Sequence, residues 1–319
     1  MRLHASVVMC VIGVGCQNEA PPPPEVVPVA RAPVVAKGPP RPAAVEDIDR
    51  SLADGLEIRR PIRDGRLALI PIVATRPTEA RPYLTLAAAM QQGVVTIREI
   101  GRDQNFHVDQ LELRNASAQP LLVLSGELVI EGLQDRVVAA DRVIEPGAKV
   151  RISVRCVEHG RTAGDLWFTT GQAMAEPSLR ERVVHGTQTE VWKQVDEINS
   201  RLSLAPRTQT YRGAAELQRT GEAGDRSTRL LGQLASLEER SRLIGFAVAI
   251  DDQIVAVERF ASSELYRALE TELVASYAAG TTGVLPHEAH TLEPTDVRAF
   301  LAGTSGITTE ASNVVLREL

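Results

Sequence analysis

The stretch from residue 121 to residue 161 constrains the fold more than any other part of the chain. It reads LLVLSGELVIEGLQDRVVAADRVIEPGAKVRISVRCVEHGR, in which short apolar or alternating runs are separated by turn residues. Such runs are typical of β-strands of a few residues each, joined by tight turns. We expect three or four strands here, paired in an antiparallel sheet that carries its polar groups at the turns.

The residues before this stretch add further strands and a helix. An Asp64-Gly65 turn between two apolar runs predicts a β-hairpin. A helix is predicted where Thr85 can cap the start and Gly93 can end it. The expected elements are a short helix at 45–55, strands at 56–61 and 67–73, a helix at 83–92, and alternating strands at 94–100 and 108–114.

Beyond residue 161 helical patterns dominate. Val191, Val195 and Ile198 fall on one face of a predicted amphipathic helix. Ser262 or Ser263 can cap a helix that follows a predicted hairpin. The expected elements are helices at 179–184, 187–202, 212–220, 226–242, 263–279 and 296–301, a loop at 171–177, hairpin strands at 243–250 and 254–260 around a turn at 251–253, and a last strand at 314–316.

These patterns together predict an α+β protein with one globular domain at 45–319. Its first part, at about 56–161, is an antiparallel, sandwich-like β region, and the part after it is mainly helical with one β-hairpin. Aromatic residues make up only 3% of the chain, so we expect a core of Val, Leu, Ile and Ala.

The first sixteen residues resemble a bacterial lipoprotein signal peptide. Arg2 supplies positive charge, residues 5–15 are almost free of polar groups, and Ile12-Gly13-Val14-Gly15-Cys16 resembles a lipobox, with Gly13 where a larger aliphatic residue is usual. The apolar run is too short to span a membrane as a helix. We expect Cys16 to carry the lipid; a plain secretory signal or a misplaced start is the alternative.

Residues 17–44 are rich in proline and lack helical or strand periodicity. Such a segment favours extended polyproline II conformations and suits a tether between a lipid anchor and a folded domain, although a disordered tail has the same composition. Gln17 stands where an aspartate commonly retains lipoproteins at the inner membrane. We therefore expect a protein of the cell envelope, lipid-anchored at the outer membrane and facing the periplasm.

The cysteines give a further expectation. Cleavage before Cys16 removes Cys10 and leaves Cys156 without a partner for an intramolecular disulfide. Cys156 ends an alternating run, so we expect a buried structural thiol. A catalytic thiol is the alternative.

Composition and motifs argue against several kinds of site. The net charge of −6 and the scarce aromatic residues argue against nucleic-acid binding. The sequence contains no glycine-rich phosphate loop and no G-x-S-x-G motif. His287 and His290 lack the i, i+4 spacing of the zinc-protease helix. We expect neither a metal nor a cofactor.

Three polar clusters in the central stretch form the candidate ligand-binding site. They place carboxylate, amide, guanidinium and imidazole groups at turns or strand ends, where strand pairing could bring them together. Arginine binds phosphorylated or polar ligands through parallel hydrogen bonds, and His or Glu can move a proton. Alternatively, these residues are polar because turns are solvated. The candidates are Glu127, Gln134, Arg136, Glu158, His159 and Arg161.

Two of these arginines are also expected to stabilise the turns. Arg136 lies beside Asp135 and could instead reach Glu127, while Arg161 follows Glu158. A guanidinium at a strand end can bond turn carbonyls and a carboxylate together. We therefore expect both arginines to matter for stability before they matter for any chemistry.

Residues from about 83 to 280 resemble the ARG and rhodanese-phosphatase-superfamily-associated protein domain, a bacterial and archaeal family of unknown biochemical function. The resemblance is strongest at Gly126-Glu127, Gln134, Arg136, Pro146-Gly147, residues 156–158 and Gly160-Arg161, and continues through Gln188, Trp192 and the hairpin and helix at 245–277. Two positions depart from the family. Leu133 stands where a lysine is usual, and Thr162 stands where a tryptophan is frequent.

The resemblance implies association with ADP-ribosylglycohydrolase-like and phosphatase-like proteins, and through them nucleotide or NAD-derived chemistry. The sequence as a whole favours an uncharacterised lipid-anchored periplasmic binding or interaction domain without demonstrated catalysis. Its expected partners are the membrane, through the lipid alone, and a protein or a small polar ligand. The alternative is a hydrolase or transferase that acts on a phosphorylated or ADP-ribose-like substrate through Glu127, Arg136, Glu158 and His159.

Overall fold

The computed structural model describes residues 55–78, 81–102, 105–161, 163–251, 253–283 and 314–316. All of them belong to one unit, Pro42–Leu319. The lipobox, the Pro-rich segment, nearly all of the predicted helix at 45–55 and the predicted helix at 296–301 lie outside the described residues. None of the described helices is long and apolar enough to cross a membrane.

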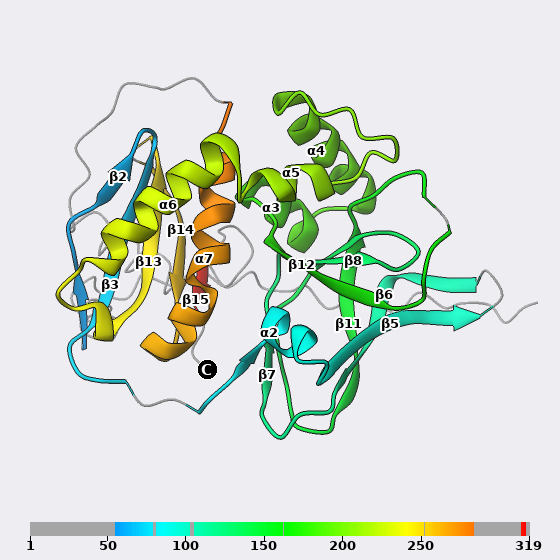
Figure 1. The fold of residues 1–319 in the computed structure, drawn as a ribbon, viewed down its shortest axis with the longest axis horizontal. Helices are drawn as coiled ribbons and strands as arrows, with labels where there is room; N and C mark the ends of the chain where they lie inside the picture. The colour runs from blue at the N-terminus through cyan, green and yellow to red at the C-terminus, as the bar shows by residue number, and fades with distance from the viewer. Residues whose placement is uncertain are drawn as a thin grey trace, which may run out of the picture. The chain divides into compact units, whose positions relative to one another are not determined.

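One sheet, here called the β3 sheet, joins the beginning and the end of the described chain (Figure 1). Its order is β1-β3-β13-β14-β15 with β2 also paired to β3, and only β14 and β15 run parallel. The strands are β1 (Leu56–Ile58), β2 (Ile62–Asp64), β3 (Leu67–Ala74), β13 (Leu243–Ile250), β14 (Gln253–Arg259) and β15 (Val314–Leu316).

Helices α6 (Gly221–Ala235) and α7 (Ser263–Gly280) cover one face of the β3 sheet (Figure 1). Leu69 of β3, Phe246 of β13 and Tyr266 of α7 belong to the apolar core on this face. Every residue of β3 is buried, which agrees with its continuous apolar sequence, because a strand covered on both faces needs no polar side.

A second sheet, here called the closed sheet, is built from the central stretch. Its order is β12-β8-β9-β11-β6-β5, and an antiparallel bridge between Arg98 and Trp167 brings its two edges together. In β11 buried residues alternate with more exposed ones, so one face lines the interior and the other faces outward. The strands are β5 (Val95–Arg102), β6 (Asn105–Asn115), β8 (Glu127–Glu131), β9 (Arg136–Val138), β11 (Lys149–Cys156) and β12 (Phe168–Met174).

A third, three-stranded sheet packs onto the closed sheet with a short helix. It has the order β10-β7-β4, with β4 (Leu84–Thr85), β7 (Leu121–Val123) and β10 (Arg142–Ile144). Helix α2 (Leu86–Gln91) begins after Thr85, whose hydroxyl accepts a hydrogen bond from the Ala88 N–H. Leu86, Leu121 and Ile144 share one buried cluster with Ile97 of β5.

Three helices cover the β8–β12 part of the closed sheet: α3 (Pro177–His185), α4 (Gln188–Arg201) and α5 (Arg212–Leu217) (Figure 1). Thr187 and Glu190 form a capping box at the start of α4. Val191, Val195 and Ile198 are buried in the cluster that holds Leu128 of β8, as their spacing predicts. A 3-10 turn, η1 (Arg240–Arg242), leads into β13.

The α+β class with antiparallel sheets is confirmed, as are the hairpin at 243–260, the helix capped by Ser262 and the strand at 314–316. The Asp64-Gly65 turn joins β2 to β3. The central stretch contains five strands, β7 to β11, rather than three or four. The expected strand at 56–61 ends at Ile58, and a separate strand, β2, begins directly after Pro61.

One expectation about the sheets is wrong. Residues 171–177 were expected to form a loop, but 168–174 form β12, whose register shifts between Thr170 and Met174 and whose Gln172 has φ 48°. This irregularity breaks the alternation that would have indicated a strand. The strands of the 56–161 region are divided among three sheets, and β3 pairs with β13 rather than with the central stretch.

Candidate functional site

Asp135, in the turn between β8 and β9, is the centre of a charged network that holds several of the predicted site residues. The carboxylate is buried. Its Oδ1 accepts from Arg212 Nη2 at 2.7 Å, from Arg161 Nη2 at 3.1 Å and from the Glu131 N–H at 3.2 Å. Its Oδ2 accepts from Arg212 Nε and from the Thr210 hydroxyl, each at 3.0 Å. Both oxygens are therefore occupied by groups of the protein.

Arg161 ties a second carboxylate and two turn carbonyls to this network. Its Nε donates to Glu158 Oε2 at 2.9 Å, its Nη1 to Gly132 O and its Nη2 to Glu131 O, both at 2.9 Å. The expectation that Arg161 joins turn carbonyls to Glu158 is confirmed. Gln134 belongs to the same network, because its Nε2 donates to the Glu158 carbonyl at 3.1 Å.

Glu158 remains an acceptor in this setting. Burial alone would raise its pKa, but hydrogen bonds from Arg161, Thr208 and the Asp135 N–H outweigh burial and lower the pKa below the ordinary value. The Asp135 N–H lies 3.0 Å from Glu158 Oε2. A carboxylate held in this way is ionised at neutral pH and is a weak base.

Arg136 has a different partner from the two that were expected. Its side chain is buried inside the closed sheet, and its Nη2 lies 3.6 Å from Glu99 Oε1 on β5. The expected pairing with the carboxylate of Asp135 or with Glu127 is wrong. In the sheet order, β11 and β6 lie between β9 and β5, so Arg136 and Glu99 come from strands that are not neighbours. A local sequence pattern cannot show a contact of this kind. Burial raises the pKa of Glu99, and Arg136 only partly opposes this shift.

His159 lies at the surface beside the network. Its ring is 4.6 Å from that of Trp192 on α4, and its Nδ1 lies 3.1 Å from Gln209 Oε1. The backbone N–H of His159 donates to Thr208 O. The imidazole is exposed, unlike the carboxylate of Glu158 beside it in sequence.

Glu127 lies at the opposite end of β8 from Asp135, so the six candidates do not form a single site. Its Oε2 accepts from the Leu124 N–H at 2.7 Å. The neighbouring Gly126 has φ 100°, and a Cβ there would lie 2.8 Å from Arg180 Cδ. The Gly126-Glu127 pair thus belongs to a left-handed backbone position packed against an arginine of α3.

Arg180 belongs to a second buried network, which the sequence did not predict. Its Nη1 lies 2.8 Å from Glu258 Oε1 of β14, its Nη2 donates to the Tyr277 hydroxyl, and that hydroxyl donates to Glu258 Oε1 at 2.6 Å. All three side chains are buried. The spacing of residues in α3 could have indicated that Arg180 is buried, because Arg180 lies three residues before Val183 on the apolar side of the helix.

Cys156 is buried and free, as expected. The amide of Gln188 accepts from the Cys156 N–H at 3.0 Å and donates to the Cys156 carbonyl at 2.7 Å, which fixes the end of β11 to α4. Burial raises the pKa of the thiol. A protonated, covered thiol favours the structural role over the catalytic one.

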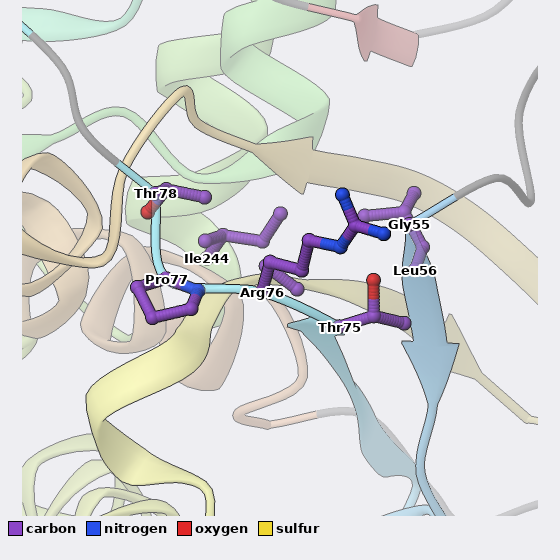
Figure 2. A pocket seen from close by; sticks show the side chains of 8 residues that line it. Gly55, Leu56, Thr75, Arg76, Pro77, Thr78 and Ile244 are labelled. Atoms are coloured by element: carbon purple, nitrogen blue, oxygen red, sulfur yellow. The ribbon is translucent and has the colours of Figure 1, made fainter.

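Two hollows open at the surface away from the Asp135 network. The larger, about 490 Å³, lies at the end of β3 and is lined by Gly55, Leu56, Ala74, Thr75, Arg76, Pro77, Thr78 and Ile244. Figure 2 shows the Arg76 side chain reaching across it toward Gly55 and Leu56. The smaller, about 240 Å³, lies on the closed sheet and is lined by Thr96, Arg98, Glu112, Arg114, Lys149 and Trp167.

Within the described ranges no group of His, Cys, Asp and Glu side chains is arranged to hold a metal ion. The His287–His290 segment lies outside those ranges.

Comparison with known proteins gives one match. The model of the ARG and Rhodanese-Phosphatase-superfamily-associated Protein domain matches residues 55–317. No curated protein and no solved structure matches the chain.

Proposed function

The chain belongs to the ARG and Rhodanese-Phosphatase-superfamily-associated Protein domain family, and from this premise we propose that it is a non-catalytic binding or interaction domain of the cell envelope. The family's name describes a domain associated with ADP-ribosylglycohydrolase-like and phosphatase-like proteins. A domain that accompanies enzymes can supply recognition while its associates supply the chemistry. The lipobox at Cys16 and the Pro-rich segment at 17–44 support a lipid anchor at the outer membrane, with the domain facing the periplasm.

The observation that carries this proposal is that the carboxylates of the best candidate site are already hydrogen-bonded to other groups of the protein. Both oxygens of Asp135 accept hydrogen bonds from arginines, and Glu158 is held by Arg161 with a lowered pKa. A general base must reach the proton that it removes, with a pKa near the working pH. The carboxylate oxygens of Asp135 and Glu158 instead accept hydrogen bonds from groups that hold the turns of the closed sheet. This arrangement supports a structural role for the network, in which it stabilises these turns, over a catalytic one.

A second candidate is a hydrolase or transferase of phosphorylated or ADP-ribose-like compounds. One observation favours it: His159 is exposed beside Glu158, and Arg161 keeps 22% of its side chain exposed at the rim of the same network. An anionic substrate could contact these two side chains without entering the interior.

The deciding experiment compares binding with turnover on the full chain. Thermal shift with ADP-ribose, NAD, sugar phosphates and anionic or neutral oligosaccharides should reveal a stabilising ligand, since a ligand at 100 times its Kd adds about 2.7 kcal/mol. The same mixtures, followed by chromatography, should show no product. Product formation that His159→Asn abolishes and Lys193→Gln, on the exposed side of α4, leaves intact would overturn the proposal in favour of the enzyme.

A further inference from the structure

The outward face of β5, β6 and β11 carries an array of cationic side chains. Backbone pairing sets two rows across these strands: Thr96–Arg114–Lys149 and Arg98–Glu112–Arg151. The residues between these rows, Ile97, Leu113 and Val150, contact the apolar cluster inside the closed sheet, with Ile97 and Leu113 fully buried and Val150 partly buried. Adjacent strands lie about 4.8 Å apart, so the charged groups of each row are neighbours.

Positive charge exceeds negative charge on this face. Arg98, Arg114, Lys149 and Arg151 oppose a single carboxylate, that of Glu112. Glu112 accepts from Arg98 Nε at 2.6 Å and lies 2.9 Å from Lys149 Nζ, and the Lys149 bond is the main cause of its lowered pKa. Among the residues that the structure describes, no carboxylate pairs with Arg114 or Arg151. The excess is local, because the whole chain has a net charge of −6.

Trp167 forms an aromatic wall beside these cations. It lines the 240 Å³ hollow with Arg98, Arg114 and Lys149, and 51% of it is exposed. Its backbone is fixed by the bridge to Arg98, by Trp167 O accepting from the Gly132 N–H at 3.2 Å, and by Asp165 Oδ1 accepting from the Trp167 N–H at 3.2 Å. The fold therefore holds the backbone of Trp167 at the edge of the hollow, while about half of the residue remains exposed to water.

We propose that this hollow binds an anionic carbohydrate, a sugar that carries sulfate, phosphate or carboxylate groups. Arg114, which lines the hollow, and Arg151, which lies outside its lining next to Glu112 in the second row, bind the anionic groups, since guanidinium forms parallel hydrogen bonds with tetrahedral or planar oxyanions. The indole covers the apolar face of a sugar ring. Thr96 and Glu112 supply a hydroxyl and a carboxylate that hydrogen-bond to sugar hydroxyls.

These features favour a sugar over other polyanions. A single aromatic side chain lines the hollow, whereas single-stranded nucleic acid is bound by successive stacking platforms. The central carboxylate of Glu112 opposes a chain with one charge on every unit, but it suits a ligand whose charges are separated by hydroxyls. The inference deepens the proposed binding function and rests on it.

The test measures binding of the full chain to a sulfated heparin hexasaccharide by isothermal titration, with a neutral dextran hexasaccharide, polyphosphate and a single-stranded oligonucleotide as comparisons. We expect the sulfated sugar to bind at least about tenfold more tightly than the other three at about 150 mM salt, where nonspecific charge attraction is screened. The double variant Arg114→Gln/Arg151→Gln should weaken binding about tenfold and flatten its salt dependence. Trp167→Ala should weaken binding about fivefold, in line with the loss of one ring contact.

Matched controls separate the site from general charge and from folding. Arg182→Gln/Arg207→Gln removes the same charge from exposed positions on α3 and in the loop after α4, and Leu166→Ala shortens an exposed apolar neighbour of Trp167. Both controls should bind like the wild type, and all variants should keep its melting temperature. If the site variants and the control variants bind the sulfated sugar equally well, the hollow is not the binding site, although the proposed binding function would still hold. If polyphosphate or the oligonucleotide binds as tightly as the sulfated sugar or more tightly, the ligand class is not an anionic carbohydrate. Catalytic turnover would contradict the proposed non-catalytic function but not the binding site.

Discussion

Arg180 of α3 and Glu258 of β14 form a buried ion pair, with Nη1 2.8 Å from Oε1, that connects the helices covering the closed sheet to the β3 sheet. The Tyr277 hydroxyl of α7 bonds to both side chains. Three elements that are distant in the sequence therefore share one set of charges. Removing Arg180 or Glu258 leaves the other charged side chain buried without its counter-ion.

We predict that Arg180→Met lowers the free energy of unfolding by about 3–5 kcal/mol, because it leaves the buried Glu258 side chain without its cationic partner. Urea denaturation followed by circular dichroism measures the change. Arg182→Met, on the exposed side of the same helix, should change stability by less than about 0.5 kcal/mol. The double variant Arg180→Met/Glu258→Gln should recover part of the loss, and a double variant as unstable as the sum of the two singles would contradict the pairing.

Arg136→Ala is expected to lower the melting temperature measurably. The substitution leaves the Glu99 carboxylate inside the closed sheet without its cation. Adding Glu99→Gln to Arg136→Ala should restore part of the stability, since the remaining buried group is then neutral. A melting temperature equal to that of the wild type would show that Arg136 is accessible to solvent.

Glu158 predicts an acid-side dependence of stability. Its pKa in the folded chain is lowered below the ordinary value of 4.5, so its contribution is present above about pH 4.5 and is lost as the pH falls through the folded pKa. The difference in unfolding free energy between the wild type and Glu158→Gln should therefore be largest near neutral pH and shrink toward pH 3. Urea titrations of both proteins across this range measure it; a difference independent of pH would exclude the linkage.

Cys156 should behave as a covered thiol. Because its sulfur is buried and its pKa is raised, native protein should react slowly with a thiol reagent, whereas protein in urea should react at once. Cys156→Ala should cost on the order of 1 kcal/mol through lost packing and leave ligand binding unchanged. Rapid labelling of the native chain would contradict the structural role.

The lipobox predicts that the mature protein begins at an acylated Cys16. Cys16→Ala should release the protein from the membrane fraction, and mass spectrometry of the wild type should find a lipid-modified amino terminus. Sucrose-gradient fractionation should place the wild type with the outer membrane, since Gln17 is not the residue that retains lipoproteins at the inner membrane. An intact Met1 in the mature protein would exclude the processing.

The parts of the fold that the sequence predicted are those encoded locally. Thr85 and Ser262 cap helices where expected, because the capping hydrogen bond joins residues three apart. The Asp64-Gly65 turn lies where expected for the same reason. In contrast, the sequence did not indicate β12, because the irregularity at Gln172 interrupts its period of two.

Contacts distant in the sequence account for the rest. Arg136 pairs with Glu99 across the interior of the closed sheet, and Asp135 with Arg212, 77 positions further along the chain. A carboxylate beside an arginine in sequence was the nearest candidate partner, but adjacent residues of a strand point to opposite faces. The outward cations Arg114 and Arg151 were likewise not apparent as a group, since only the pairing of β6 with β11 brings their rows together.

The pairing of β3 with β13 determines when the chain can fold. Leu67 and Ile250 are register partners, so the entirely apolar strand β3 remains unpaired with its main neighbour until the chain has been made as far as β13. Contacts between such distant segments slow folding, and an unpaired apolar strand is exposed to aggregation meanwhile. The export that the lipobox predicts would benefit from this delay, because the β3 sheet cannot close until β13 has been made.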